Sequence, residues 1–270
     1  MLSPLQATIL GIVEGLTEFL PVSSTGHLIL VSRLLHLRGE AVNTFEIVIQ
    51  SGALVAVLGL YRHRLVSMWH GFGGRDPAGR VLLGSLGVSF LPAAILGAWL
   101  HRVIKAQLFR PWPVVVALAI GGVLMIGVDR WAKSRDQGRV RALESMNLSG
   151  ALLIGCAQCL ALWPGTSRAM ATIVAGLVVG LSTPAAAEYS FLLALPTLSA
   201  ATVFDLVSGG RILLRDVGFV SIGCGFLTSA LAASLAIRGF IQCVTRRGLA
   251  LFGWYRLGVA ACVWWVVPPT

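Results

Sequence analysis

Six apolar stretches constrain the fold of this 270-residue chain more than any other feature. Each is about as long as the roughly 20 residues that a helix needs to cross a bilayer. Only 12% of the residues are charged, whereas a soluble domain has about a quarter. The sequence therefore predicts an all-α polytopic membrane protein with six transmembrane helices, at roughly 43–60, 81–100, 112–130, 185–206, 216–236 and 249–267.

Two further apolar segments, 5–37 and 149–182, are interrupted in the middle. In each, an apolar helix is stopped by a proline, and a hydroxyl-rich turn leads into a second apolar helix. Neither half of such a segment is long enough to cross the bilayer alone. Irregular backbone at membrane depth is tolerated only where protein buries it. We therefore expect two re-entrant helical hairpins.

The two broken segments also match each other, which indicates an internal duplication. A glycine, a Glu or Gln, and a proline recur in the same order: Gly11, Glu14 and Pro21, then Gly155, Gln158 and Pro164. Each half then contains one hairpin and three spans. Because three is odd, the second half begins on the opposite face of the membrane. This predicts an inverted-topology repeat, with copies at 1–131 and 148–270, within a single membrane domain, 1–270.

The basic residues lie mostly between these stretches and give the chain a net charge of +10. They are not clustered with aromatic side chains, so we expect no nucleic-acid partner. Loops that face the cytoplasm collect Lys and Arg. The predicted topology places twelve Lys and Arg residues on one face of the membrane and seven on the other. The face with twelve is therefore expected to be cytoplasmic, which leaves both termini outside. The twelve are Arg62, Arg64, Arg75, Arg80, Arg130, Lys133, Arg135, Arg139, Arg141, Arg238, Arg246 and Arg247, and the seven are Arg33, Arg38, Arg102, Lys105, Arg110, Arg211 and Arg215.

Glu14 and Glu18 lie one helical turn apart in the first broken segment, on the same face. A charged side chain at membrane depth costs at least about 2.5–3.5 kcal/mol, so it faces a cavity or a partner. Two carboxylates repel each other unless a cation or a shared proton lies between them. We expect the pair to bind a divalent cation beside phosphate, or to act in acid–base catalysis. A buried ion pair with Arg168 is the structural alternative.

The turn after Pro21 opens a helix with Ser23, Ser24, Thr25 and Gly26, followed by His27. Serine and threonine are preferred helix N-caps, so capping alone would explain them. A helix N-terminus is also a ready anion site. A histidine beside two serines and two carboxylates can act as nucleophile or base. We therefore predict substrate contacts along this turn, with the nucleophile left open between Ser24, His27 and water.

The second broken segment repeats the turn with Thr166, Ser167 and Arg168, and Thr172 follows one turn later. The guanidinium of Arg168 matches phosphate oxygens in a bidentate manner and can stabilise a transferring phosphoryl group. An ion pair with the acidic residues is compatible with that role. Two helix N-termini, one arginine and two carboxylates together predict a diphosphate site, with the lipid tail of the substrate among apolar helices.

The motifs EGLTEFLPVSSTGH (14–27) and CLALWPGTSRAMAT (159–172) resemble the two signature regions of the undecaprenyl-diphosphate phosphatase family, also known for bacitracin resistance. The resemblance implies six spans and two re-entrant hairpins in the bacterial inner membrane, with a site that opens outward. It implies hydrolysis of undecaprenyl diphosphate to the monophosphate, which recycles the carrier lipid for peptidoglycan synthesis.

The same resemblance assigns roles by motif position. Glu14 and Glu18 match the acidic pair of the family, Ser24 and His27 its proposed nucleophile or base, and Arg168 its phosphate-binding arginine. It implies dependence on a divalent cation, Mg²⁺ or Ca²⁺. This chain departs from the family pattern PGxSRSGAT with Ala169 and Met170, which removes a hydroxyl and a glycine after the arginine.

Two alternatives to a phosphatase stay open at this point. Inverted repeats with broken helices are common in secondary transporters, so the protein could move a lipid phosphate rather than cleave one, or do both. A membrane acid phosphatase is disfavoured, because that group needs a histidine after its SR motif and no histidine follows His101. The oligomeric state is not fixed by the sequence, and a homo-oligomer is compatible with it.

Overall fold

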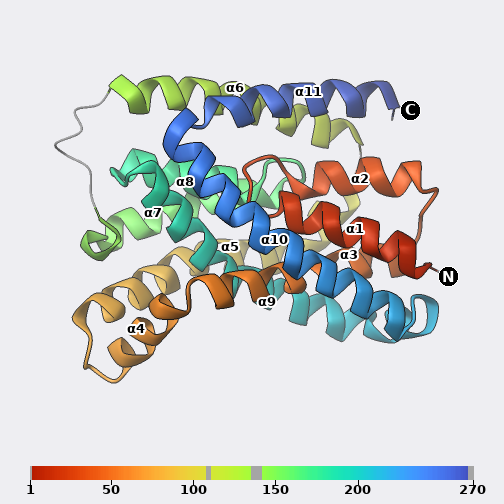
Figure 1. Cartoon of the computed structure of the whole chain (residues 1–270), viewed down its shortest axis with the longest axis horizontal. Helices are drawn as coiled ribbons and strands as arrows, with labels where there is room; N and C mark the ends of the chain where they lie inside the picture. Colours follow the sequence, from red (N-terminus) through yellow and green to blue (C-terminus); the bar gives the residue numbers. More distant parts are fainter. Residues whose placement is uncertain (1, 108–110, 135–141, 267–270) are drawn as a thin grey trace.

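This computed structural model describes residues 2–107, 111–134 and 142–266. They form eleven α-helices and two short 3-10 helices (Figure 1). Their bounds are α1 Pro4–Thr17, α2 Ser24–Leu34, α3 Glu40–Leu60, α4 Arg62–Phe72, α5 Pro77–Gln107, α6 Pro111–Ser134, η2 Leu143–Ser145, α7 Leu148–Gln158, η3 Cys159–Leu162, α8 Arg168–Val179, α9 Thr183–Asp216, α10 Phe219–Arg247 and α11 Ala250–Val266.

Among the described residues, five helices are long and apolar enough to cross a membrane, by length and composition. They are α3, α5 over Pro77–Leu100, α6 over Trp112–Ser134, α9 over Thr183–Val207, and α10. These helices coincide with five of the six predicted spans and make the chain a multi-pass membrane protein. The sixth predicted span forms α11, an apolar helix of 17 residues, and position 267 lies outside the described residues.

Several helix bounds differ from those expected. The loop predicted after the first span forms the helix α4, whose Trp69 and Phe72 are exposed while Met68 is buried. Helices α5 and α9 continue to Gln107 and Asp216, beyond the predicted ends at 100 and 206, and α10 runs from Phe219 to Arg247 rather than over 216–236. The predicted bounds follow hydropathy, which falls where polar residues begin. A helix is defined by its backbone hydrogen bonds, which do not stop at that point, and this explains the differences.

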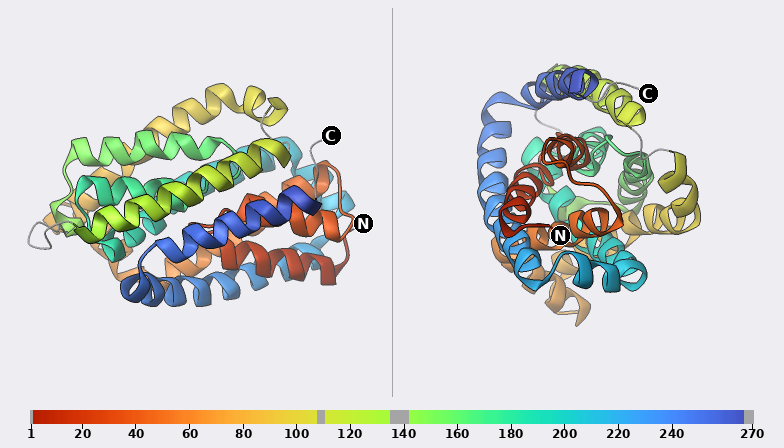
Figure 2. Two further views of the ribbon diagram at one scale, coloured as in Figure 1. Left: turned by 90° about the horizontal axis from the view of Figure 1, so that it is seen from above. Right: turned by 90° about the vertical axis from the view of Figure 1, so that its right-hand side faces the viewer.

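The chain connections gather at the two ends of the long axis of the molecule (Figure 1). Helices α1 and α2 form a hairpin that starts at the end carrying the N-terminus, turns near the middle and returns to the same end. Helices α7 and α8 form a second hairpin from the opposite end. A view from above gives the same arrangement, with the turns of both hairpins in the interior (Figure 2).

Helices of the first half pack against helices of the second. Helix α1 lies against α10, and α7 lies against α5, while α3 packs on α9 and α6 on α11. Gly11 and Gly155 permit the first two contacts. A Cβ at Gly11 would overlap the carbonyl oxygen of Gly225, and a Cβ at Gly155 would lie 2.6 Å from that of Ser89. The two glycines that align in the sequence therefore serve the same kind of contact.

The two hairpin turns share an unusual backbone conformation. Ser23 has φ 71° and ψ 97°, and Ser167 has φ 70° and ψ 115°. A residue other than glycine with positive φ costs of the order of 1–3 kcal/mol, and such residues cluster at functional sites. Each serine is also the N-cap of the next helix, accepting a hydrogen bond from the amide of Gly26 or Met170.

Four buried phenylalanine rings contact one another in a row that starts next to the first turn. Phe19, just before the first turn, contacts Phe191 of α9 edge-on, with ring centroids 5.4 Å apart. Phe191 contacts Phe240 of α10, and Phe240 contacts Phe252 of α11. These contacts join the first hairpin to three helices of the second half and so help to hold the first turn in position.

Candidate active site

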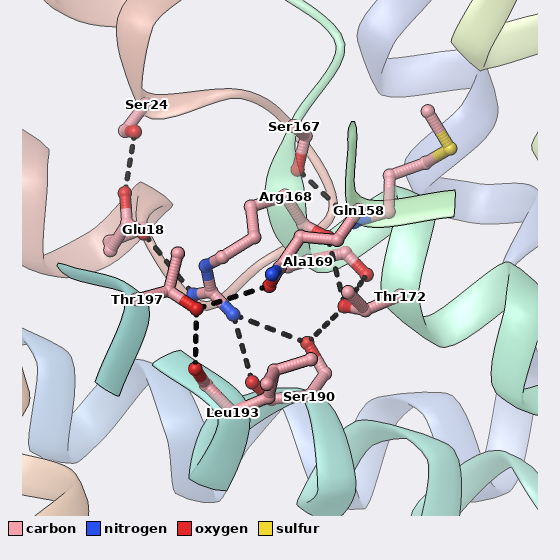
Figure 3. Close-up of polar contacts among 11 residues, drawn as sticks. Glu18, Ser24, Gln158, Ser167, Arg168, Ala169, Thr172, Ser190, Leu193 and Thr197 are labelled. Carbon is pink, nitrogen blue, oxygen red and sulfur yellow. Dashed lines mark hydrogen bonds and ion pairs between the residues drawn. The ribbon is translucent and has the colours of Figure 1, made fainter. Parts of the chain in front are cut away.

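Glu18, Ser24 and Arg168 form one connected polar group between the two hairpin turns (Figure 3). The hydroxyl of Ser24 donates to Oε2 of Glu18 at 2.7 Å, and Nη2 of Arg168 donates to Oε1 of Glu18 at 3.2 Å. The side chains of Arg168 and Glu18 are 8% and 7% exposed, so this ion pair is buried. The residues that the sequence placed in two separate motifs therefore meet at one carboxylate.

Arg168 is held on its other side by α9. Its Nη1 donates to the carbonyl of Ser190 at 2.8 Å, and Phe19 lies below the guanidinium, 5.7 Å from ring centroid to Cζ. The hydroxyl of Thr172 donates to the Ser190 hydroxyl at 2.7 Å and so holds the Ser190 side chain in place. The Nε of Arg168 is buried and has no hydrogen-bond partner among the described residues. That donor is available to an oxygen of a ligand.

Glu14 lies one turn before Glu18 and is fully buried. Neither carboxylate oxygen of Glu14 has a hydrogen-bond partner in the described part of the chain. Two buried acids this close are costly unless a cation or a shared proton lies between Glu14 and Glu18. Residues 2–107, 111–134 and 142–266 contain no group of three or more His, Cys, Asp or Glu side chains able to hold a metal. Glu14 and Glu18 would supply two carboxylate ligands to a Mg²⁺ ion, a number that suits an ion that is usually completed by phosphate oxygens and water.

Helix α1 ends at Thr17, four residues before Pro21, so Glu18 is the first residue after the helix. Its amide still donates to the carbonyl of Glu14 at 2.9 Å. The two acidic residues thus keep the helical spacing that the sequence predicted, although Glu18 is the C-cap rather than an interior residue.

The hairpin turns hold the remaining predicted contacts. Ser23 is buried and Thr25 half-buried at the start of α2, and Gly26 lies against the side chain of Leu118. Thr166 and Ser167 are half-buried beside the start of α8. The capping interpretation of Ser23 and Ser167 is confirmed, and direct contacts of these residues with substrate stay a prediction.

The two ring nitrogens of His27 contact Ser23 and Tyr255 in this structure. Its Nδ1 lies 2.7 Å from the carbonyl oxygen of Ser23, which can only accept, so Nδ1 carries the proton. Its Nε2 lies 2.8 Å from the hydroxyl of Tyr255, and the two rings stack at an angle of 6°. In the neutral tautomer Nε2 accepts from Tyr255. The carbonyl of Ser23 therefore sets the tautomer of His27, and Tyr255 of α11 holds its ring by a hydrogen bond and stacking.

The sequence analysis missed Ser190 and Tyr255. Ser190 follows Glu188 in a long apolar span, where a serine is an ordinary residue, and its carbonyl carries no sequence signal. Tyr255 lies in the last apolar stretch and is separated from His27 by 228 positions. Only tertiary packing brings either residue to the site.

The second hairpin differs from the first in its acidic positions. Gln158 aligns with Glu14, and its side-chain oxygen accepts from Thr197 at 3.3 Å. The first hairpin therefore supplies the carboxylates and the hydroxyl, and the second supplies the guanidinium. Carboxylate, serine hydroxyl and arginine around one point suit transfer of a phosphoryl group.

The chain is similar to known proteins over nearly its whole length. A protein named undecaprenyl-diphosphatase from Sorangium cellulosum (strain So ce56) is 52% identical over 262 residues, covering 96% of this chain and 85% of the relative. One of the same name from Nitrosomonas eutropha is 48% identical, covering 96% of this chain and 93% of the relative. A third protein of this name, from Solidesulfovibrio magneticus, is 44% identical, covering 99% of this chain and 100% of the relative. The model of the family described as bacitracin resistance protein BacA matches residues 7–262, so the chain belongs to the BacA family.

Proposed function

We propose that this protein is an integral membrane phosphatase that hydrolyses undecaprenyl diphosphate to undecaprenyl phosphate and inorganic phosphate. This would recycle the lipid carrier for peptidoglycan synthesis in the bacterial inner membrane and confer bacitracin resistance. The observation that carries the proposal is the connected group of Ser24, Glu18 and Arg168 between the two hairpin turns. The printed names of the relatives support the same substrate.

In the proposed reaction, Ser24 Oγ attacks the terminal phosphorus of the diphosphate. Glu18 takes the hydroxyl proton across the 2.7 Å hydrogen bond. The bond from the terminal phosphorus to the bridging oxygen breaks, and undecaprenyl phosphate leaves with that oxygen. Water then hydrolyses the phosphoserine and releases inorganic phosphate. The contacts of His27 with Ser23 and Tyr255 support Ser24 over His27 as nucleophile.

Arg168 would stabilise the charge on the transferring group. Its unpaired Nε can donate to a phosphate oxygen, and the N-termini of α2 and α8 would favour an anion beside them. When Glu18 takes the proton, its attraction for Arg168 weakens. The guanidinium is then free to follow the charge as it develops on the phosphoryl oxygens. Arg168 thus binds a carboxylate before the reaction and phosphate during it.

A divalent cation, Mg²⁺ or Ca²⁺, is proposed to bind at Glu14 and Glu18. The support is the unpaired carboxylate of Glu14 beside a second acid. When bound, such an ion would neutralise charge on the diphosphate. Removal of the cation by a chelator is expected to stop phosphate release, and readdition is expected to restore it.

The proposed topology has six spans and two re-entrant hairpins in an inverted repeat, with copies at 1–131 and 148–270. The support is the opposite direction of the two hairpins and the reciprocal packing of α1 on α10 and α7 on α5. The proposed cytoplasmic end carries the connections around Arg62, Arg75 and Lys133. The chain termini would then lie outside, where the diphosphate is expected.

The test is phosphate release by the purified protein in detergent, with undecaprenyl diphosphate as substrate and Mg²⁺ or Ca²⁺ present. We expect release that stops after chelation. Absence of release under these conditions would contradict the enzyme proposal. A transporter would instead move labelled undecaprenyl phosphate between the leaflets of a vesicle without cleaving the diphosphate.

A further inference from the structure

Arg256 of α11 is fully buried within an apolar helix. It forms five hydrogen bonds, and all five acceptors are backbone carbonyls. A guanidinium has five N–H donors, so none is left for a ligand. Within the described residues, Arg256 forms no ion pair with a carboxylate. Its role therefore differs from that of Arg168.

The five carbonyls belong to three separate segments. Nη1 donates to Pro21 in the first hairpin turn at 3.2 Å and to Thr166 in the second turn at 3.1 Å. Nη2 donates to Gly165 in the second turn at 2.9 Å. The remaining bonds join α6, from Nη2 to Ala117 at 2.9 Å and from Nε to Leu118 at 3.3 Å. One side chain thus bridges both turns and anchors them to a third helix.

Helix α6 makes room for this guanidinium through Gly121. A Cβ at that position would overlap Nη2 of Arg256. Position 121 also lies one turn after Ala117, so a side chain there would push Nη2 away from the Ala117 carbonyl. The absence of a side chain at Gly121 is therefore part of the same arrangement.

The turn carbonyls that accept from Arg256 lie just before the site residues in the sequence. Pro21 is three positions before Ser24, and Thr166 is two positions before Arg168. Both turns contain a serine with positive φ, a conformation that the surroundings must maintain. A shift of one turn relative to the other would separate Ser24 and Glu18 from Arg168. A misplacement of about 1 Å can reduce a rate about a hundredfold.

We propose that Arg256 is a positioning residue that fixes the spacing of the two hairpin turns and so sets the geometry of the diphosphate site. It acts through the turns and touches no phosphate itself. The inference rests on the proposed function, because the site that it positions is the proposed phosphatase site.

The test compares Arg256→Lys and Gly121→Ala with wild type, and uses the exposed Arg246→Lys as the matched control. Lysine keeps the charge but has three donors on one atom and cannot bridge both turns. Gly121→Ala keeps Arg256 and displaces its guanidinium. For each folded variant we measure KM and kcat with undecaprenyl diphosphate, and inhibition by inorganic pyrophosphate, which has no lipid tail. All assays are run well below the unfolding temperature of each variant.

We expect KM and the inhibition constant for pyrophosphate to rise about tenfold or more in both variants, and kcat/KM to fall about 10- to 100-fold. Arg246→Lys should match wild type. If both variants lose only thermal stability and keep the wild-type constants per folded molecule, Arg256 is merely structural and the inference is wrong. If Arg256→Lys does not fold, Gly121→Ala decides the question. If wild type releases no phosphate, the proposed function itself fails, which is a distinguishable result.

Discussion

Arg168 and Glu18 form a buried ion pair that joins two residues 150 positions apart, one from each half of the chain. The pair connects the turn of the first hairpin to the first residue of α8. Each partner has a second contact, Glu18 with Ser24 and Arg168 with Ser190. The ion pair is therefore both the link between the two motifs and the centre of the proposed site.

Removing one charge of this pair should destabilise the protein and also stop turnover. Glu18→Gln leaves the guanidinium buried without its carboxylate, which costs about 3–5 kcal/mol. The double variant Glu18→Gln/Arg168→Met removes both charges of the pair and should regain much of that stability without regaining activity. Thermal unfolding in detergent and phosphate release measure the two effects separately. Near wild-type turnover in Glu18→Gln would show that the site lies elsewhere.

Much of the fold could be predicted because each apolar stretch is a local property of the chain. The six predicted spans and both broken segments correspond to helices, and among the described residues five of these helices are long and apolar enough to cross a membrane. The alignment of Gly11 with Gly155 corresponds to two similar helix contacts. Glu18, Ser24 and Arg168 could be selected because polar side chains in apolar segments are costly and usually have a partner. Their residue types and spacing were sufficient for that choice.

The residues that could not be predicted act through long-range or backbone contacts. Tyr255 reaches His27 across 228 positions, and Ser190 holds Arg168 partly through a carbonyl. Arg256 was visible as a charge in an apolar stretch, but its five acceptors are carbonyls that any residue would carry. Helix α4 was missed because its exposed aromatic residues alternate with polar ones.

Ser24 and Ser23 are neighbours with different expected roles. Ser24→Ala should abolish phosphate release, because it removes the proposed nucleophile. It should also cost about 1.5–3 kcal/mol in stability, because Glu18 loses a buried hydrogen bond. Ser23→Ala removes the N-cap of α2, so we expect a loss of about 1 kcal/mol in stability and reduced but measurable release. Acid quenching of wild type during turnover, followed by mass spectrometry, should find the phosphoryl group on Ser24. A parallel quench in alkaline denaturant preserves phosphohistidine, and a phosphoryl group found there on His27 would reverse the assignment.

Tyr255→Phe should weaken catalysis without disturbing the fold. The phenyl ring can keep the stacking on His27, while the hydrogen bond to Nε2 is lost. Such a bond contributes about 0.5–1.5 kcal/mol, which corresponds to a loss of about two- to tenfold in kcat/KM. Trp254→Phe, at the exposed neighbouring position, is the control. Identical kinetics of Tyr255→Phe and wild type would mean that the orientation of His27 does not affect the reaction.

Glu144 should make stability depend on pH at the end of the molecule that carries α4. Arg64 donates a hydrogen bond to this carboxylate at 2.6 Å, which lowers the pKa of Glu144 below its usual value of 4.5. A carboxyl whose folded pKa is lowered stabilises the folded state above the usual value, and this contribution is lost as the pH falls through the lower one. The unfolding temperature of wild type should therefore decrease more steeply below about pH 4.5 than that of Glu144→Gln. Glu40→Gln, at the exposed start of α3, is the control and should keep the wild-type slope. Equal slopes for wild type and Glu144→Gln would show that the contact with Arg64 contributes nothing in solution.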